Sequence, residues 1–295
     1  MSDFRLKVFQ SVAKNLSFTK ASQELFVSQP AITKHIQELE ATYQTRLFDR
    51  QGNKISLTES GRLLLEHCER ILEDYKRLEY EMHLLHNEYI GELKLGASTT
   101  IAQYVLPPLL GSFIGKFPQV NLSLLNGNSR EIEAALQEHR IDLGLVEGVF
   151  RLPNLKYTTF LEDELVAVVH SKSRLQLPEE ITPQDLPAIP LVLRERGSGT
   201  LDVIERSLQK HGVKLSSLHV LMYLGSTESI KLFLENSDCM GIVSIRSICK
   251  ELAAGTFRVV EIKDMPMLRD FCFVQLQGQE GGLSQAFMNY MFMSR

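Results

Sequence analysis

The chain has 295 residues, of which 44% are hydrophobic, and its formal net charge is -4. This composition excludes a disordered polymer and predicts two or three compact units, each with its own core. The N-terminus lacks an apolar leader and no apolar run approaches the ~20 residues of a membrane span, so we expect a cytoplasmic protein with no membrane partner.

The charges are distributed unevenly along the chain. Residues 1–62 contain nine Lys or Arg and six Asp or Glu, whereas residues 63–90 contain three basic and seven acidic residues. A basic head therefore precedes an acidic segment, which is the arrangement expected when only the head contacts nucleic acid.

The residues that most often bind metals show no metal-binding spacing. Four scattered cysteines favour reduced thiols, mostly buried, with a redox switch as the alternative: Cys68, Cys239, Cys249 and Cys272. The eight histidines are equally dispersed, and neither a phosphate-binding loop nor a nucleophile elbow is present. We therefore expect no cofactor, no metal and no enzymatic activity.

The first residues predict a helix-turn-helix. A first helix is expected over about Asp3–Lys14. Ser17 can cap a short second helix, and Ser28 can cap a third. Pro30 follows this second cap, and a proline in the first turn marks the beginning of a helix rather than a break. Two short helices joined by a tight turn have the outline of a helix-turn-helix.

A hairpin and a long helix are expected next. Gly52 and Asn53 suit a hairpin turn, and the alternation over Lys54–Leu57 predicts a return strand, so the hairpin resembles a wing. Thr58 then opens a long helix. Its apolar residues follow a heptad pattern, which favours dimerisation, with packing on the helix's own core as the alternative: Leu64, Cys68, Ile71, Tyr75, Leu78, Met82, Leu85 and Tyr89.

From Gly91 onward, apolar strands alternate with helical stretches. This order predicts an α/β fold with a mostly parallel sheet, arranged as two similar units with a cleft between them. The expected domains are a winged helix-turn-helix over 1–58, a linker helix over 59–90 and an α/β domain over 91–295. We expect subdomain I to comprise about 91–163 and 268–295, and subdomain II about 164–267.

Several segments together resemble the LysR-type transcriptional regulators. They include "FTKASQELFVSQPAITKHIQELE", "LFDR", "LTESG", "YVLP", "FPQV" and "IDLGLVEG". The segments "LRERGSGT" and "LGSTESIK" further resemble the branch linked to carbon-dioxide fixation and sulfur assimilation genes. The resemblance implies a winged helix-turn-helix, a periplasmic-binding-protein type of effector domain, and a homodimer that pairs into a tetramer. It also implies double-stranded promoter DNA, a small-molecule effector and RNA polymerase as partners.

Candidate DNA contacts lie on the exposed side of the third helix and around it. The exposed end of a recognition helix needs small or polar residues that reach base edges, and Gln29 and Lys34 suit adenine and guanine. Helix N-termini and the wing can contact phosphate. The candidates are Ser17, Thr19, Ser28, Gln29, Pro30, Thr33, Lys34, Gln37, Arg50 and Lys54. Simple solvation is the alternative for each. Gln44 stands where the family usually has glycine, so we expect left-handed strain there.

Candidate effector contacts lie where two strands end and two helices begin. Hydroxyl groups and free amides at helix N-termini favour anions, and glycines allow close approach of a ligand. The resemblance places the effector pocket between the two subdomains. The candidates are Ser98, Thr99, Thr100, Glu147, Arg194, Gly197, Ser198 and Thr200. Plain helix capping is the alternative for the hydroxyl groups, including that of Thr200. Leu201 stands where this branch often has arginine, which argues against an effector with a second anionic group.

The sequence thus predicts a DNA-binding transcriptional regulator controlled by a small anionic effector. The alternative is a stand-alone small-anion-binding protein without a DNA role, because residues 91–295 alone resemble a periplasmic receptor.

Overall fold

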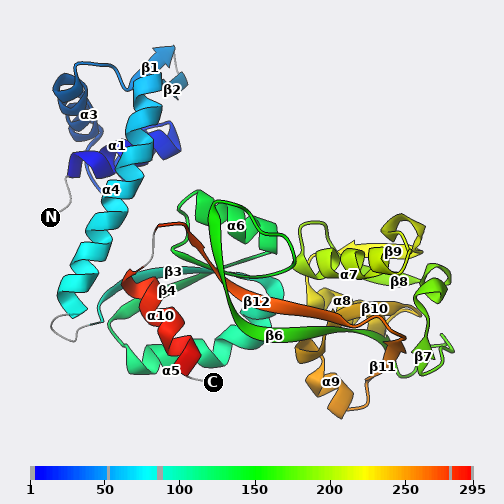
Figure 1. The fold of residues 1–295 in the computed structure, drawn as a ribbon. Coiled ribbons are helices and arrows are strands. Elements are labelled where there is room, and N and C mark those ends of the chain that lie inside the picture. Colours follow the sequence, from blue (N-terminus) through cyan, green and yellow to red (C-terminus); the bar gives the residue numbers. More distant parts are fainter. Residues whose placement is uncertain (1–3, 52–53, 85–88, 279–280, 294–295) are drawn as a thin grey trace. The chain divides into compact units, whose positions relative to one another are not determined.

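The computed structural model describes residues 4–51, 54–84, 89–278 and 281–293, which form two compact units (Figure 1). The first unit is Met1–Glu88 and the second is Tyr89–Arg295. Within the described ranges, no helix is both long and apolar enough to cross a membrane.

The first unit contains the predicted helix-turn-helix. Its first three helices are α1 (Phe4–Asn15), α2 (Phe18–Glu24) and α3 (Gln29–Tyr43). The Ser17 hydroxyl caps α2 by accepting a hydrogen bond from the amide of Lys20, and Ser28 caps α3 by accepting one from the amide of Ala31. Pro30 lies in the first turn of α3, where a helix needs no amide donor. These caps confirm the predicted helix starts.

A β-hairpin follows α3 and forms the predicted wing. Its strands are β1 (Phe48–Gln51) and β2 (Lys54–Leu57). They pair antiparallel, with Phe48 opposite Leu57. Leu47 and Phe48 are buried and anchor the hairpin in the core of the first unit. The predicted turn at Gly52 and Asn53 lies outside the described residues.

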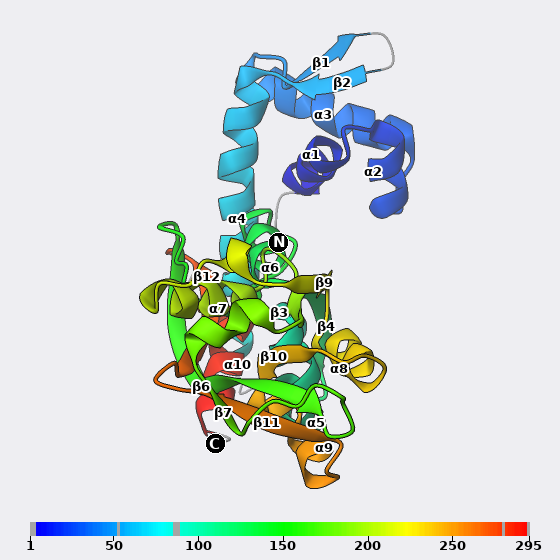
Figure 2. The ribbon, with the colours of Figure 1, turned by 90° about the vertical axis from the view of Figure 1, so that its right-hand side faces the viewer.

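The long helix α4 (Glu59–Leu84) changes its surroundings along its length. Cys68 and Leu72 are buried in the core of the first unit, and α1 lies beside α4 (Figure 2). Ile71, Leu78 and Met82 are instead exposed, Leu78 by 52% and Met82 by 53%. One face of α4 therefore packs on the core of the first unit as far as Leu72, whereas Leu78 and Met82 beyond it face solvent. Leu85 lies outside the described residues.

The second unit is built on a mixed β-sheet. Its strands are β3 (Gly91–Ser98), β4 (Val120–Gly127), β5 (Leu143–Glu147), β6 (Leu155–His170), β7 (Glu180–Ile181), β8 (Leu191–Arg194), β9 (Val220–Leu224), β10 (Met240–Ser244), β11 (Phe257–Ile262) and β12 (Met267–Leu276). The main path is β4-β3-β5-β12-β6-β10-β8-β9, and β11 pairs with β6 and β7. Pairing is parallel among β3, β4 and β5 and among β8, β9 and β10, but antiparallel wherever β6 or β12 takes part. The expectation of a mostly parallel sheet was therefore too simple.

Helices cover both halves of this sheet. They are α5 (Leu106–Lys116), α6 (Ser129–Gln137), α7 (Gly199–Lys210), α8 (Thr227–Glu235), α9 (Cys249–Ala253) and α10 (Gly282–Met293). Short turns are η1 (Ile101–Val105), η2 (Pro183–Ala188), η3 (Leu215–Ser217) and η4 (Ile245–Ser247). The helix expected over about 101–117 is divided, because η1 is a π-helical turn and α5 begins only at Leu106. Separate apolar cores under β3–β5 and under β8–β10 define two subdomains.

Two long strands connect these subdomains. β6 and β12 pair antiparallel from Leu155 opposite Leu276 to Leu165 opposite Met267, and they run from one half of the second unit to the other (Figure 1). They cross in opposite directions, which explains why the sheet is mixed. Asp163 and Arg269 are cross-strand partners, two residues from the end of this pairing at Leu165 and Met267.

The four cysteines are free thiols. Cys68, Cys239 and Cys272 are buried as expected, whereas Cys249 is exposed. Burial raises the pKa of the Cys68 thiol to about 12, which keeps it protonated and unreactive.

Candidate functional site

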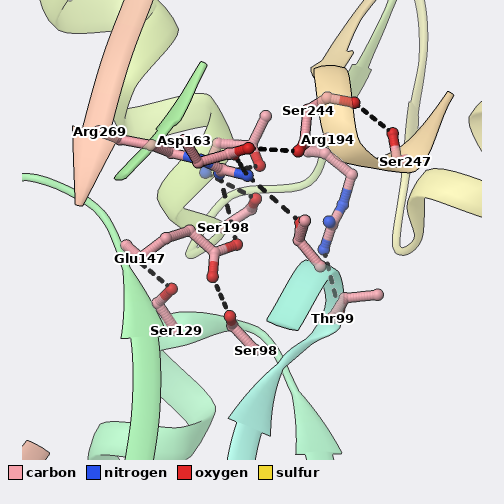
Figure 3. A network of polar contacts seen from close by, with 12 residues as sticks. Ser98, Thr99, Ser129, Glu147, Asp163, Arg194, Ser198, Ser244, Ser247 and Arg269 are labelled. Atoms are coloured by element: carbon pink, nitrogen blue, oxygen red, sulfur yellow. Dashed lines mark hydrogen bonds and ion pairs between the residues drawn. The ribbon is translucent and has the colours of Figure 1, made fainter. Parts of the chain in front are cut away.

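A buried ion pair joins the two connecting strands. Arg269 donates to the same carboxylate oxygen of Asp163 from both Nε and Nη2, each at 2.8 Å, and both side chains are fully buried (Figure 3). The Ser244 hydroxyl donates to the other oxygen of Asp163 at 2.7 Å. The pair thus has the matched charges and hydrogen bonds that a buried ion pair requires.

The Arg269 guanidinium also reaches the first helical turn of each subdomain. Its Nη1 donates to the Thr200 hydroxyl oxygen at 2.9 Å, and its Nη2 lies 3.5 Å from the Thr100 hydroxyl oxygen. Thr100 precedes η1 in subdomain I, and Thr200 lies in the first turn of α7 in subdomain II. The structure therefore brings together the two predicted threonines on one guanidinium that the sequence analysis did not select.

Glu147 lies beside this guanidinium at the end of β5. Its carboxylate is 3.5 Å from Nη1 of Arg269, and it accepts a hydrogen bond from the Ser98 hydroxyl (Figure 3). Burial raises the pKa of the Glu147 carboxyl above its ordinary value, although Arg269 and Arg194 oppose the shift. The negative charge of Asp163 raises this pKa further. Glu147 consequently retains its proton more readily than an exposed glutamate does.

The "GSGT" loop of subdomain II lies directly against β5. A Cβ atom on Gly199 would lie 2.0 Å from the carbonyl oxygen of Glu147, so only glycine allows this approach. Gly197 has a φ of +92°, and its carbonyl oxygen accepts a hydrogen bond from the amide of Arg130 at 3.3 Å. Ser198 is the N-cap of α7, so the expectation that Thr200 caps this helix was wrong.

Arg194 is a second buried arginine, at the end of β8. Its Nε and Nη2 pair with Glu195 at 2.8 and 3.0 Å, and Nη2 also donates to the Thr99 hydroxyl oxygen at 3.2 Å. Nη2 also lies 3.3 Å from the carbonyl oxygen of Gly225. The remaining nitrogen, Nη1, is buried and has no hydrogen-bond partner among the described residues. A buried, unsatisfied donor is costly, and an anion would satisfy it.

A cavity of about 470 Å³ borders the network on the side of the connecting strands. Its lining residues are Gly148, Val149, Arg151, Glu162, Arg206, Leu268, Arg269 and Asp270. None of the predicted effector residues lines it, and Arg269 belongs to both the cavity and the network. Among the described residues, no group of three or more His, Cys, Asp or Glu could hold a metal ion.

Five of the predicted DNA-contact residues lie in α3, and the others lie at the start of α2, at the N-cap of α3 and in the wing. Ile32, Ile36 and Leu39 are buried on the opposite face. The exposed positions are Thr19, Ser28, Gln29, Pro30, Lys34 and Gln37, with Ser17 and Thr33 partly exposed. The Arg50 and Lys54 side chains lie outside the described ones, although both residues have backbone positions in the wing. Gln44 has a φ of 50°, so the expected left-handed conformation at the end of α3 is confirmed.

The two units each match a known protein family model. The model described as "Bacterial regulatory helix-turn-helix protein, lysR family" matches residues 4–62, and "LysR substrate binding domain" matches residues 86–292. The chain belongs to the LysR family. It is therefore a DNA-binding transcriptional regulator with an effector-binding domain, and proteins of this family bind target DNA and small-molecule effectors and form oligomers.

Individual relatives place this LysR regulator more narrowly. It is 29% identical over 269 residues to the HTH-type transcriptional regulator CysL of Bacillus subtilis, covering 91% of this chain and 89% of CysL. It is 30% identical over 289 residues to the RuBisCO operon transcriptional regulator of Acidithiobacillus ferrooxidans, covering 98% and 92%. The solved regulatory domain of Synechocystis CcmR in complex with 2-PG has a TM-score of 0.62 and 28% identity, covering 69% of this chain and 97% of that one. These relatives confirm the predicted resemblance to the carbon-dioxide fixation and sulfur assimilation branch.

The sequence analysis missed the charged residues that organise the network in this LysR regulator. Arg269 and Asp163 lie in strands 106 residues apart in sequence, and only the pairing of β6 with β12 brings them together. Ser129, whose hydroxyl donates to the Glu147 carbonyl oxygen at 2.7 Å, was missed as well. The one available signal was the charged dipeptide Arg269–Asp270 at the head of an otherwise apolar strand.

Proposed function

We propose that this LysR regulator binds promoter DNA through the polar face of α3 and is controlled by a small anion that binds within the Arg194–Arg269 network. The observation that carries the effector half is the buried Nη1 of Arg194, which has no hydrogen-bond partner among the described residues. Burial of the Arg194 guanidinium is unfavourable while one of its donors is unsatisfied, and an anionic ligand would satisfy that donor. We propose no enzymatic activity for this regulator. Because it binds promoter DNA, we expect it to act in the cytoplasm.

The DNA-binding half rests on an amphipathic recognition helix. Its buried side fixes α3 on the core, and its exposed side offers Gln29 for adenine and Lys34 for guanine. Ser17, Thr19 and Ser28 would hold the DNA backbone, together with Arg50 and Lys54 from the wing. Pro30, Thr33 and Gln37 would complete the contact face. We propose residues 1–58 as the DNA-binding domain and 59–90 as the linker helix, followed by the effector domain over 91–295.

The effector half rests on groups that converge from both subdomains. Ser98, Thr99 and Thr100 come from subdomain I, and Arg194, Gly197, Ser198 and Thr200 come from subdomain II, with Glu147 between them. Arg269 and Arg194 are the cations of this set: Arg194 faces Glu195, whereas Arg269 faces both Asp163 and Glu147. We propose a compact anion as the effector, and the related CcmR domain, which was solved with 2-PG, supports a small ligand of this kind.

The geometry suggests how such an anion would alter the DNA-binding units. Arg269 contacts Thr100 of one subdomain, Thr200 of the other and Asp163 on the connecting strand. A ligand that takes over one of these bonds would bind open and closed arrangements with different affinity, and this difference is what drives a conformational change.

The exposed seam of α4 supports dimerisation. Ile71, Leu78 and Met82 are spaced by seven and four residues and face solvent in the isolated chain. An apolar heptad seam of this kind is buried efficiently against a second copy of the same helix. We propose a homodimer formed through this seam, with further pairing into a tetramer.

Thermal stability in the presence of anions tests the effector site. The full chain would be heated with sulfate, phosphate and 2-PG, beside the variants Arg194→Met and Thr200→Ala. We expect one anion to raise the melting temperature of the wild type and to have no effect on either variant. Arg140→Met is the matched control, because Arg140 is exposed and its guanidinium pairs with Glu138, so its response should equal that of the wild type. An equal rise in melting temperature in the wild type and all variants would show that the anion does not bind within this network.

A further inference from the structure

One aromatic side chain in the first unit is explained by neither packing nor backbone conformation. Phe26 is 95% exposed, although its sequence neighbours Leu25 and Val27 both pack against the core of this unit. Its position in the chain is the turn between α2 and the N-cap of α3. A large, fully exposed aromatic ring is unusual on a surface that has only solvent as its neighbour.

The backbone at Phe26 is also unfavourable for its residue type. The amide of Val27 donates to the carbonyl oxygen of Ser22 at 3.1 Å, and the amide of Phe26 donates to the carbonyl oxygen of Gln23 at 3.4 Å. These two bonds form a Schellman motif that ends α2, and Phe26 occupies its left-handed position with a φ of 53°. Glycine is the usual residue at this position because a Cβ atom is strained there.

A residue that is both strained and exposed next to a functional element indicates a functional constraint. Phe26 is two residues from Ser28 and three from Gln29, both of which belong to the proposed DNA face. The exposed residues next to it in sequence are Gln23, Glu24, Ser28, Gln29 and Pro30, so Phe26 is the large apolar side chain that this segment exposes. Apolar groups on duplex DNA are few: the thymine methyl in the major groove and the carbons of the deoxyribose.

We propose that Phe26 is a DNA-contact residue, and that its ring packs against a thymine methyl or a deoxyribose at the edge of the groove entered by α3. This inference rests on the proposed function of α3 as the recognition helix. It differs from the other candidate contacts because it is apolar. Phe26 would therefore contribute affinity without neutralising a phosphate and without releasing counterions.

The test compares two glycine substitutions in the same unit. Phe26→Gly removes the ring and relieves the left-handed strain, and Gln44→Gly relieves the equivalent strain at the opposite end of α3, about 20 Å away along the helix. Affinity of the full chain would be measured by fluorescence anisotropy, using a duplex that the wild type selects from random-sequence DNA. Melting temperature would be recorded for each variant.

We expect Phe26→Gly to weaken DNA binding about tenfold, Phe26→Leu to weaken it less, and Gln44→Gly to leave it unchanged. Both glycine variants should melt at or above the temperature of the wild type. The dependence of affinity on salt should keep its slope in Phe26→Gly, whereas Lys54→Met, which removes a proposed phosphate contact, should reduce that slope by about one.

Deoxyuridine in place of each thymine distinguishes the two apolar partners. A loss of wild-type affinity at one position that is absent in Phe26→Gly identifies the thymine methyl, and unchanged affinity at every position identifies the deoxyribose. Wild-type affinity in Phe26→Gly overturns the proposal, and so does a lowered melting temperature, because the ring would then be a packing residue. Failure of the wild type to bind any duplex would instead overturn the proposed function itself.

Discussion

Two loops meet at the polar network, and they use their hydroxyl groups differently. Each loop follows a strand and precedes a helical segment. In residues 98–100, no side chain caps the turn η1, and the hydroxyl groups bond to charged side chains of the network instead. In residues 195–200, Ser198 caps α7 and leaves Thr200 to accept from Arg269.

A hydroxyl group that caps its own helix contributes to local stability, whereas one that bonds to the opposite subdomain can couple the two subdomains. A cap stabilises its own helix whatever the opposite subdomain does. Of the hydroxyl groups in residues 98–100, that of Thr99 accepts a hydrogen bond from Arg194 of the opposite subdomain, so this bond depends on the arrangement of the two halves. The Ser98 hydroxyl instead bonds to Glu147 of its own subdomain. We therefore expect the loop 98–100 to respond to closure through Thr99, and the loop 195–200, which caps its own helix, to act as the more fixed support. The π-helical turn after Thr100 is consistent with this role, since such turns are frequent at functional sites.

Removing Arg269 should produce the largest effect, because both loops depend on it. Arg269→Met leaves Asp163 buried without its cation, and we expect a loss of about 3–5 kcal/mol in the free energy of unfolding of the second unit. Urea denaturation followed by circular dichroism measures this loss.

Arg246→Met provides the matched control for this experiment. Arg246 also approaches Asp163, at 3.5 Å, but its side chain is 42% exposed. Removing it should cost less than about 1 kcal/mol, as is typical of exposed pairs. Equal losses in the two variants would contradict the view that Arg269 organises the network.

The close contact between the "GSGT" loop and β5 should give the next largest effect. Gly199→Ala places a Cβ atom against the carbonyl oxygen of Glu147, and we expect a loss of about 1–3 kcal/mol. Gly111→Ala is the control, because Gly111 in α5 has open space around it and alanine favours helices. Thermal unfolding should therefore show a lower melting temperature for the first variant and an unchanged or higher one for the second.

These contacts also show which parts of the site could be predicted from the sequence. Caps, turns and the polar face of α3 depend on neighbouring residues, and Pro30, Ser28 and Gln44 were interpreted correctly for that reason. The "GSGT" loop was selected for its glycines, and the structure gives the reason in the contact of Gly199 with β5. Arg269 and Asp163 have no local signal, since their pairing depends on two distant strands. The π-helical turn was missed as well, because its hydrophobic pattern resembles that of an ordinary helix start.

A direct comparison of the two loops should give smaller losses of stability. Ser198→Ala removes the cap of α7 and should cost about 1 kcal/mol. Thr100→Ala removes no cap and only one hydrogen bond of 3.5 Å, so we expect a smaller loss of stability. Urea denaturation of both variants tests this order. If Thr100→Ala costs more than Ser198→Ala, the loop 98–100 is a structural support rather than a sensor.

The smallest effect concerns the proton on Glu147, which lies between the two loops. Burial raises the pKa of this carboxyl in the folded protein, so the folded state binds the proton more tightly than the unfolded state does. The free energy of unfolding should therefore decrease as pH rises from the unfolded pKa, near 4.3, through the raised folded pKa. Glu147→Gln removes this titration, so the variant should gain stability relative to the wild type as pH rises toward neutrality, and lose that advantage in acid. Urea denaturation of both proteins at several pH values measures the difference, and a constant difference across the range would show that the pKa of Glu147 is the same in the folded and unfolded proteins, which contradicts the expected shift.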